Sequence, residues 1–239
     1  MSIFEIEVAI DEILERTYNV KSFRFVRPEA TVYKPGQYLF VTVRFLDKEI
    51  TKPLSISSSP TEKEFIEFTK KLTNSDFSQT LNNMKIGKMI RVRFPLGGFT
   101  FTGEYEKIAF LSGGIGVTPI RSIIKYATDL NLNSSIILID SNNRVEDIVF
   151  KEELDLMQEK NRGLHIIYTL TDLNYDMSSW KGCKGYITED MIKMNIPNYK
   201  DRRFYLCGPP MMVDAMKKIL VDKLDLKKES IILENFFGY

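Results

Sequence analysis

The sequence has one histidine and two cysteines, and these small numbers exclude several kinds of chemistry. An iron–sulfur cluster needs about four protein thiolates, and a chain with two cysteines cannot hold a four-cysteine cluster alone. His165 lies in an apolar run typical of a strand, and no second histidine can share a metal ion or a catalytic proton. We therefore expect no metal site, and we expect Cys183 and Cys207 to be free thiols.

The sequence also lacks a charge excess and any long apolar run. Lys and Arg total 33 against 32 for Asp and Glu, with no basic tract, so nucleic acid is not an expected partner. No apolar run approaches the ~20 residues of a membrane span, and the first residues show no targeting pattern. We expect a cytoplasmic protein without a membrane span, and the sequence leaves its oligomeric state open.

The first part of the chain has the periodicity of strands. Apolar residues recur at every second position, as in half-buried strands, and turn residues separate the runs. The predicted strands cover residues 4–11, 20–26, 38–44, 65–70 and 89–94. Many short strands joined by turns predict an antiparallel β-barrel.

The second part alternates apolar strands with amphipathic helices. The predicted strands cover residues 108–111, 136–139, 165–168, 204–206 and 231–233. One helix carries Phe150, Leu154 and Met157 on its core face, and another carries Met212 and Met216. Such alternation predicts a parallel sheet covered on both faces. We therefore predict a barrel domain at 1–103 and an α/β domain at 104–239.

A glycine-rich turn joins the strand that ends near Leu111 to a helix that begins near Pro119. Bare backbone N–H groups and the positive end of a helix suit a dinucleotide pyrophosphate, and Pro119 suits the first helical turn. A tight strand-to-helix connection is the plainer explanation. We expect a side chain at Gly116 to obstruct the approach of a nucleotide. The nucleotide-binding candidates in this turn are Gly113, Gly114, Gly116 and Thr118.

Three other stretches give this turn a context: Pro-Gly-Gln-Tyr at 35–38, Lys-Pro-Leu-Ser-Ile-Ser at 52–57 and Cys-Gly-Pro at 207–209. Their order and spacing resemble the ferredoxin–NADP reductase superfamily of flavoproteins, and the resemblance covers nearly the whole chain. It implies a flavin-binding antiparallel barrel followed by a parallel-sheet nucleotide-binding domain. It favours FAD as cofactor and leaves FMN open.

The resemblance also implies a flavin site. At the positions of residues 52–55, relatives usually have Arg-x-Tyr-Ser. Their arginine binds a flavin phosphate, their tyrosine lies against the flavin, and their serine lies near the reactive N5 of the flavin. Only Ser55 matches outright; Lys52 replaces the arginine, and Leu54 replaces the tyrosine. Lys52 keeps the positive charge without the guanidinium fork. A serine-rich loop with a surface lysine is the alternative. The flavin-binding candidates are Lys52, Pro53, Leu54, Ser55, Ser57, Thr69, Ser78 and Gly97.

On the nicotinamide side, the resemblance places Cys207 beside the nicotinamide, so the catalytic candidates are Ser55 and Cys207. A buried cysteine that only fills space is the alternative. Relatives often end with Glu-x-Phe, or with an aromatic residue that covers the flavin. This points to Phe236, with Phe237 and Tyr239 as alternatives. An aromatic tail packed on its own domain would look the same. The nicotinamide-side candidates are Cys207, Gly208, Pro209, Phe236 and Tyr239.

The stretch after the strand at 165–168 bears on nucleotide preference. Relatives that use NADPH often carry Ser-Arg there, which binds the 2′-phosphate. This chain has Thr171 and Asp172 instead, and the carboxylate of Asp172 would repel a phosphate. We therefore expect NADH to be preferred as co-substrate, and Arg144 is the residue that keeps NADPH open.

The resemblance predicts an enzyme, an NAD(P)H-dependent flavoprotein reductase. Electrons would pass from the reduced nicotinamide through bound FAD to a separate carrier, such as ferredoxin, another iron–sulfur protein or an oxygenase component. A free-flavin reductase is the enzymatic alternative. An electron-transfer or regulatory subunit that acts only within a complex is the other.

Overall fold

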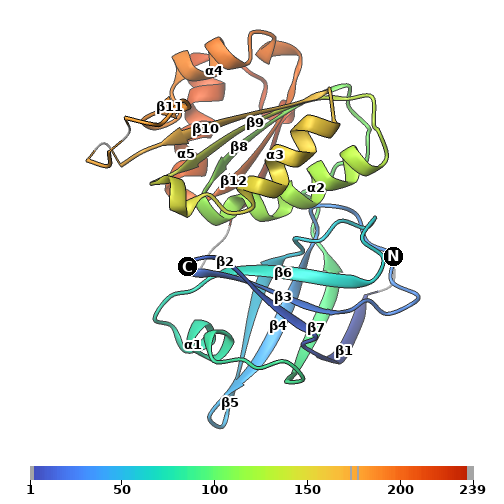
Figure 1. Ribbon diagram of the computed structural model, residues 1–239. Helices are drawn as coiled ribbons and strands as arrows, with labels where there is room; N and C mark the ends of the chain where they lie inside the picture. Colours follow the sequence, from blue (N-terminus) through green and yellow to red (C-terminus); the bar gives the residue numbers. More distant parts are fainter. Residues whose placement is uncertain (1–2, 173, 177, 236–239) are drawn as a thin grey trace. The chain divides into compact units, whose positions relative to one another are not determined.

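The computed structural model describes residues 3–172, 174–176 and 178–235. Its contacts divide the chain into two compact units (Figure 1). Of the described residues, the first unit contains 3–102 together with Thr118–Asp129, and the second contains Gly103–Val117 and those from Leu130 to Asn235. One helix that follows the glycine turn is thus grouped with the N-terminal unit, away from its sequence neighbours.

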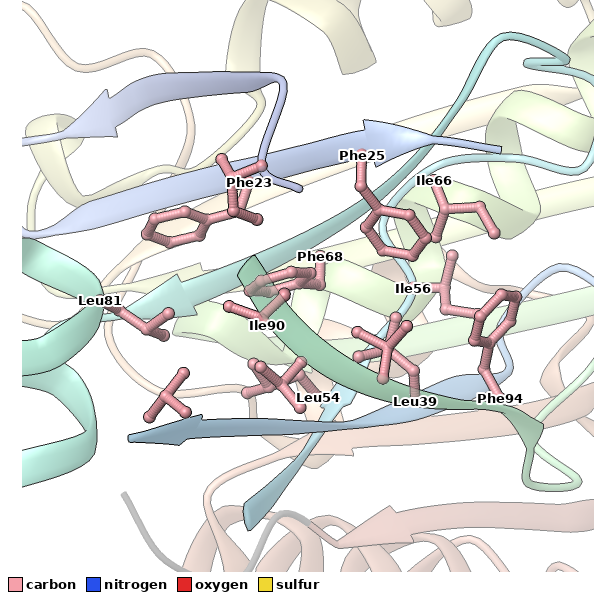
Figure 2. Packing of buried hydrophobic residues seen from close by; sticks show 14 of the residues in the cluster. Phe23, Phe25, Leu39, Leu54, Ile56, Ile66, Phe68, Leu81, Ile90 and Phe94 are labelled. Carbon is pink, nitrogen blue, oxygen red and sulfur yellow. The ribbon is translucent and has the colours of Figure 1, made fainter. Parts of the chain in front are cut away.

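The first unit consists of two antiparallel sheets around an apolar core. One sheet has the order β1 (Phe4–Ala9), β7 (Met89–Leu96), β4 (Tyr38–Phe45) and β5 (Lys48–Ser55). The other has the order β2 (Glu12–Thr17), β3 (Val20–Val26) and β6 (Phe65–Lys71). The side chains of Phe23, Phe25, Phe68 and Phe94 fill the space between them (Figure 2). The antiparallel arrangement predicted from alternation is confirmed.

Two strands of this unit, β2 and β5, have no alternating pattern and were not predicted. β5 carries charged residues and Pro53, and the Lys52–Ser55 segment reads as a loop in the sequence. β5 pairs only with β4, at the edge of its sheet, where a proline costs little because its missing N–H need not serve a second neighbour. The short helix α1 (Asp76–Asn82) follows β6, and the Ser75 side chain caps it by accepting from Ser78 N–H.

The second unit contains a six-stranded parallel sheet, which confirms the predicted α/β architecture. Its order is β11 (Cys183–Lys184), β10 (Leu164–Leu170), β9 (Ser135–Asn142), β8 (Lys107–Gly113), β12 (Arg203–Gly208) and β13 (Ile231–Asn235). The observed strands are longer than the predicted ones because polar residues continue them at their ends. β11 has two residues, too few to give a periodic signal.

Helices cover both faces of this sheet. α3 (Lys151–Lys160) lies on the face opposite to α4 (Glu189–Asn195) and α5 (Pro210–Lys218) (Figure 1). Met216 of α5 lies in the apolar core with Leu111 and Leu206 of the sheet, as predicted, and the predicted Met212 is partly buried against the same core. Val213, which was not predicted, is also buried there. Among the described residues, no helix is both long enough and apolar enough to cross a membrane.

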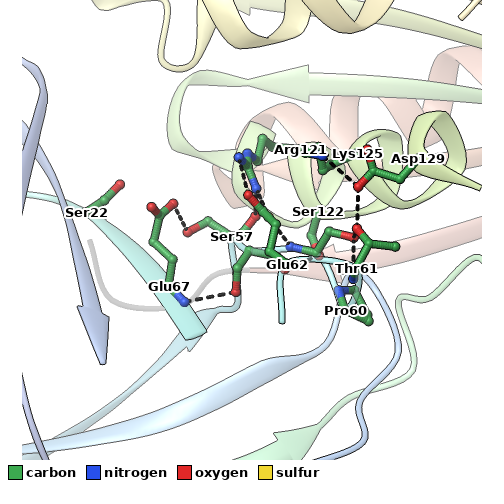
Figure 3. Close-up of polar contacts among 12 residues, drawn as sticks. Ser22, Ser57, Pro60, Thr61, Glu62, Glu67, Arg121, Ser122, Lys125 and Asp129 are labelled. Atoms are coloured by element: carbon green, nitrogen blue, oxygen red, sulfur yellow. Dashed lines mark hydrogen bonds and ion pairs between the residues drawn. The ribbon is translucent and has the colours of Figure 1, made fainter. Parts of the chain in front are cut away.

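The helix α2 (Val117–Asp129) is held to the first unit by polar contacts. The Arg121 guanidinium donates to the Ser57 carbonyl oxygen at 3.1 Å and forms an ion pair with Glu62. The Ser122 hydroxyl donates to the Ser58 carbonyl oxygen at 2.6 Å (Figure 3). These bonds fix the backbone of the segment that follows β5.

Candidate functional site

The glycine turn follows β8 and passes through a single 3-10 turn, Gly114–Gly116, into α2. Gly114 has a φ of 53°, in the left-handed region that favours glycine. A Cβ on Gly114 would meet none of the described atoms within 4 Å, so the space beside this residue is open. Pro119 lies in the first turn of α2, as predicted. The turn has the form of an anion cradle at a helix N-terminus.

Gly116 has a structural reason for being glycine that differs from the predicted one. A Cβ on Gly116 would collide with the Cys207 carbonyl oxygen and lie 2.7 Å from Gly208 Cα. The turn therefore packs directly on the end of β12. A side chain at residue 116 would displace this backbone before it could obstruct a nucleotide.

The end of β12 forms the second half of this site. Gly208 has a φ of 158°, and Pro209 and Pro210 begin α5. β12 lies next to β8, and the strand order of the sheet reverses at this pair, because β9 and β10 extend to one side and β13 to the other. Ligands of open α/β sheets bind at the carboxyl ends of strands at such a reversal. The structure thus brings Gly113 and Cys207 together at the expected place.

Four polar side chains lie in one row across this end of the sheet. Strand register places Glu234 beside Cys207, Cys207 beside Ser112, and Ser112 beside Asp140. Within the described part of the chain, Glu234 Oε2, Ser112 Oγ and Asp140 Oδ1 are buried without a hydrogen-bond partner. Buried polar groups usually have partners, so this row can accept a polar ligand or water.

Burial sets the protonation of this row. It raises the pKa of Glu234 to about 8 and, together with the nearby Glu234 carboxyl, raises the pKa of the Cys207 thiol well above its usual range. Cys207 is therefore a neutral thiol and not a nucleophilic thiolate. Sequence analysis missed Glu234 and Asp140. The available signals were a charged residue directly after the apolar run 136–139, for Asp140, and one directly after the apolar run 231–233, for Glu234.

Asp140 gives a testable pH dependence. Burial raises the pKa of its carboxyl from 3.8 to about 6, and the neighbouring Asn142 and Ser112 side chains oppose that rise only in part. A raised folded-state pKa contributes stability below about pH 4 that is lost as the pH rises through 6. Relative to Asp140→Asn, the parent should lose about 2 kcal/mol of unfolding free energy between pH 4 and pH 7.

The measurement is urea unfolding at both pH values, followed by the fluorescence of Trp180, the single tryptophan, which lies in the same unit. Asp214→Asn, at an exposed position of that unit, is the control and should show the parent's pH dependence. An Asp140→Asn variant with the parent's pH dependence would show that this carboxyl does not titrate as described.

In the first unit, the predicted flavin site centres on the end of β5. Ser55 is 2% exposed, and its Oγ has no hydrogen-bond partner in the described part of the chain. Leu54 belongs to the apolar core, so only its edge is open to a ligand. Burial, followed by the positive charges of Lys52 and Lys71, lowers the pKa of Lys70 to about 8. Lys52 and Lys71 thus both lie close enough to Lys70 to interact with it, where the sequence prediction relied on Lys52 alone.

The remaining flavin candidates are occupied by the protein itself. The hydroxyls of Ser57 and Thr69 are buried and bonded to each other at 2.9 Å. Ser78 N–H donates to the Ser75 side chain at the start of α1, at 3.3 Å. A Cβ on Gly97 would lie 2.7 Å from the Tyr38 ring. Direct flavin contacts by these four candidates stay predictions, and Pro53 stays one as well.

At the same, carboxyl end of the sheet, after β9 and β10, the structure brings Arg144 to Asp172. Arg144 Nε donates to Asp172 Oδ2 at 2.8 Å, and the guanidinium also lies 5.7 Å from the centre of the Tyr175 ring. The Thr171 hydroxyl bonds to the Asn143 side chain at 3.0 Å. The cation that the stretch 169–172 lacks is therefore supplied by the loop after β9. Phe236, Phe237 and Tyr239 lie outside the described residues.

Comparison with known proteins agrees with this geometry. Residues 7–101 match the family described as Oxidoreductase FAD-binding domain, and residues 110–218 match Oxidoreductase NAD-binding domain. The chain is 32% identical to NADH-cytochrome b5 reductase 1 of Ajellomyces capsulatus, over 92% of this chain and 76% of that protein. It is 29% identical to the glycine betaine monooxygenase reductase subunit of Chromohalobacter salexigens, over 87% of this chain. This chain spans 58% of the length of that subunit.

Among solved structures, the FAD/NAD-binding domain of nitric oxide dioxygenase from Vibrio cholerae superposes with a TM-score of 0.85 at 23% identity. The match covers 96% of this chain and 98% of that one, and it shows the shared two-domain fold. The chain therefore belongs to the ferredoxin–NADP reductase-like family, in which an FAD-binding domain precedes an NAD-binding domain.

Proposed function

We propose that this chain passes electrons from a reduced nicotinamide nucleotide, through FAD bound to its first unit, to a separate acceptor protein. The observation that carries the proposal is the buried hydroxyl of Ser55, which has no partner among the described residues. Ser55 is the last residue of β5, in the domain that matches the FAD-binding family. A buried hydroxyl left unbonded costs free energy, and a ligand atom at this place would remove that cost.

The residues present fit FAD. When bound, FAD accepts a hydride and releases electrons one at a time. Ser55 would bond to the reacting part of the ring system and hold its orientation. Lys52, Lys70 and Lys71 would supply positive charge to the phosphates as point charges, without the fork that arginine offers.

The polar row of the second unit would bind the nicotinamide. Its carboxamide has donors and an acceptor, and the unpartnered atoms of Ser112 and Glu234 offer matching groups. The neutral Cys207 thiol between them would contribute shape and no negative charge. The open space beside Gly114 would receive the pyrophosphate.

The relatives support a protein as the electron acceptor. One is named as the reductase subunit of a monooxygenase and another as a cytochrome b5 reductase. We propose that the acceptor of this chain is likewise a separate protein, an oxygenase component or a small carrier. An iron–sulfur acceptor would have to bring its own cluster, because this chain has only two cysteines.

We further propose a preference for NADH over NADPH, determined by the Arg144–Asp172 pair. Asp172 can accept a hydrogen bond from the ribose 2′-hydroxyl of NADH and would repel a 2′-phosphate. Arg144 is already bonded to this carboxylate, so little of its charge is available to a phosphate. Asp172→Asn would release Arg144 and should raise kcat/KM for NADPH about tenfold.

Steady-state kinetics with both nucleotides at moderate salt checks this preference. Arg144→Ala, which removes the cation, is expected to widen the preference for NADH. If the parent prefers NADPH, the proposal is refuted. If Arg144→Ala then loses this preference for NADPH, the Arg144 guanidinium binds the 2′-phosphate.

The proposed function is tested by anaerobic titration of the FAD-loaded protein with NADH and with NADPH, followed by absorbance. Stoichiometric bleaching of retained flavin supports it. If the flavin dissociates once it is reduced, and the protein then reduces many equivalents of added free flavin, the result would instead support a free-flavin reductase. Absence of reduction, together with inactivity toward an artificial acceptor, would support a subunit that acts only in a complex.

A further inference from the structure

We propose that Thr69 and Glu67 are positioning residues for Ser55, acting through a closed ring of buried hydrogen bonds. The inference deepens the proposed function, because it concerns how this chain prepares its own flavin site. It also reassigns Ser57 and Thr69, which the sequence suggested as direct flavin contacts. Their hydroxyls belong to the ring instead.

The ring has five members, and the hydrogen bonds through its three hydroxyls run in one direction, from Arg16 to Glu67. Arg16 Nε donates to Ser22 Oγ at 2.8 Å, and Ser22 Oγ lies 2.7 Å from Thr69 Oγ1. Thr69 donates to Ser57 Oγ at 2.9 Å, and Ser57 donates to Glu67 Oε1 at 2.7 Å. Arg16 Nη2 closes the ring on Glu67 Oε2 at 2.9 Å. Because Thr69 gives its proton to Ser57, Ser22 must be the donor to Thr69.

The direction matters because it runs from a cation to an anion. Each hydroxyl accepts from the side of Arg16 and donates toward Glu67, so each bond polarises the next. The Glu67 side chain is fully buried, and Arg24 Nε also bonds to Oε2 at 2.8 Å. Such a buried charged network seldom adds net stability over an apolar core of the same volume. Its value lies in fixing one geometry.

The geometry it fixes is that of the segment after β5. Ser57 N–H donates to the Glu67 carbonyl oxygen at 2.8 Å, while the Ser57 hydroxyl is held by the Glu67 carboxylate, so one residue holds Ser57 at two points. The Arg121 guanidinium donates to the carbonyl oxygen of Ser57 (Figure 3). Ser55 is two residues away, and Ile56 between them is anchored by its bridge to Phe68. The direction of the Ser55 hydroxyl therefore depends on the ring.

The test removes one link without changing volume. Thr69→Val deletes the donor to Ser57 and the acceptor for Ser22 while keeping a β-branched side chain. We expect the saturating rate of flavin reduction by NADH to fall about tenfold, with the Kd for FAD changed by less than about threefold. Thr69→Ser restores the hydroxyl and should reduce at a rate within about twofold of the parent.

Thr42→Val is the matched control, because Thr42 and Thr51 form an exposed hydroxyl pair, 2.8 Å apart, in the same unit. It should leave both the rate and the Kd unchanged. A Thr69→Val protein that reduces like the parent, or a Thr69→Ser protein as slow as Thr69→Val, would overturn the proposal. If Thr69→Val does not fold, Ser22→Ala replaces it in the test. Ser22→Ala should also slow flavin reduction about tenfold with little change in the Kd for FAD, and a parent-like rate would overturn the proposal. Failure of the parent to bind or reduce flavin would instead refute the proposed function.

Discussion

Replacing Ser55 with alanine is expected to slow flavin reduction by NADH about a hundredfold while leaving FAD bound. The expectation follows from the buried hydroxyl, which has no partner in the described part of the chain and which we propose bonds to the flavin. Alanine removes the bonding group without changing the backbone of β5. The loss should therefore appear in the saturating rate and not in the Kd for FAD.

Stopped-flow absorbance gives the rate, and fluorescence titration of apoprotein gives the Kd. Lys52→Ala is the informative comparison, because it removes a positive charge proposed to meet phosphate and leaves Ser55 intact. It should weaken FAD binding about tenfold and keep the saturating rate within about twofold of the parent. If both variants behave like the parent, the assignment of this segment to the flavin is wrong.

The second large effect is expected from Gly116→Ala. A Cβ there would collide with the Cys207 carbonyl oxygen, which is backbone and cannot swing away. The variant should lose at least about a hundredfold in kcat/KM for NADH, because the glycine turn and the end of β12 would move apart. FAD binding should be preserved, since the flavin candidates lie in the other unit.

Gly114→Ala separates packing from binding. A Cβ at Gly114 meets none of the described atoms within 4 Å, so the fold should tolerate it at a cost of about 1 kcal/mol for the left-handed backbone. This variant should raise KM for NADH and keep the unfolding profile of the parent, whereas Gly116→Ala should change both. A Gly116→Ala protein with normal stability and normal NADH kinetics would contradict the packing described for this turn.

Sequence periodicity predicted most strands of this fold because their burial repeats at a fixed interval. It missed β5 because an edge strand needs neither a continuous apolar face nor a full set of N–H donors. The end of β5 is also where Ser55 lies, so the motif identified the residue while periodicity missed the element that holds it.

The parts of the site that the sequence did not predict depend on strand order. Ser112 and Asp140 are distant in the sequence and become neighbours only because β8 pairs with β9. Glu234 reaches Cys207 only because β13 pairs with β12. Arg144 was considered as a free cation, and its bond to Asp172 depends on the pairing of β9 with β10. Local patterns hold no information about such pairings.

The grouping of α2 with the N-terminal unit has a consequence for recombination between relatives. A chimaera joined at residue 103 would exchange the C-terminal part of the chain together with Arg121 and Ser122, which hold the segment after β5. The recipient would then receive a foreign helix against its own Ser57 and Ser58. A graft that keeps Thr118–Asp129 from the recipient needs two additional junctions, one on each side of that helix. The unit that would have to be exchanged as a whole is therefore made of two separate segments of the chain, although each family match covers one continuous segment.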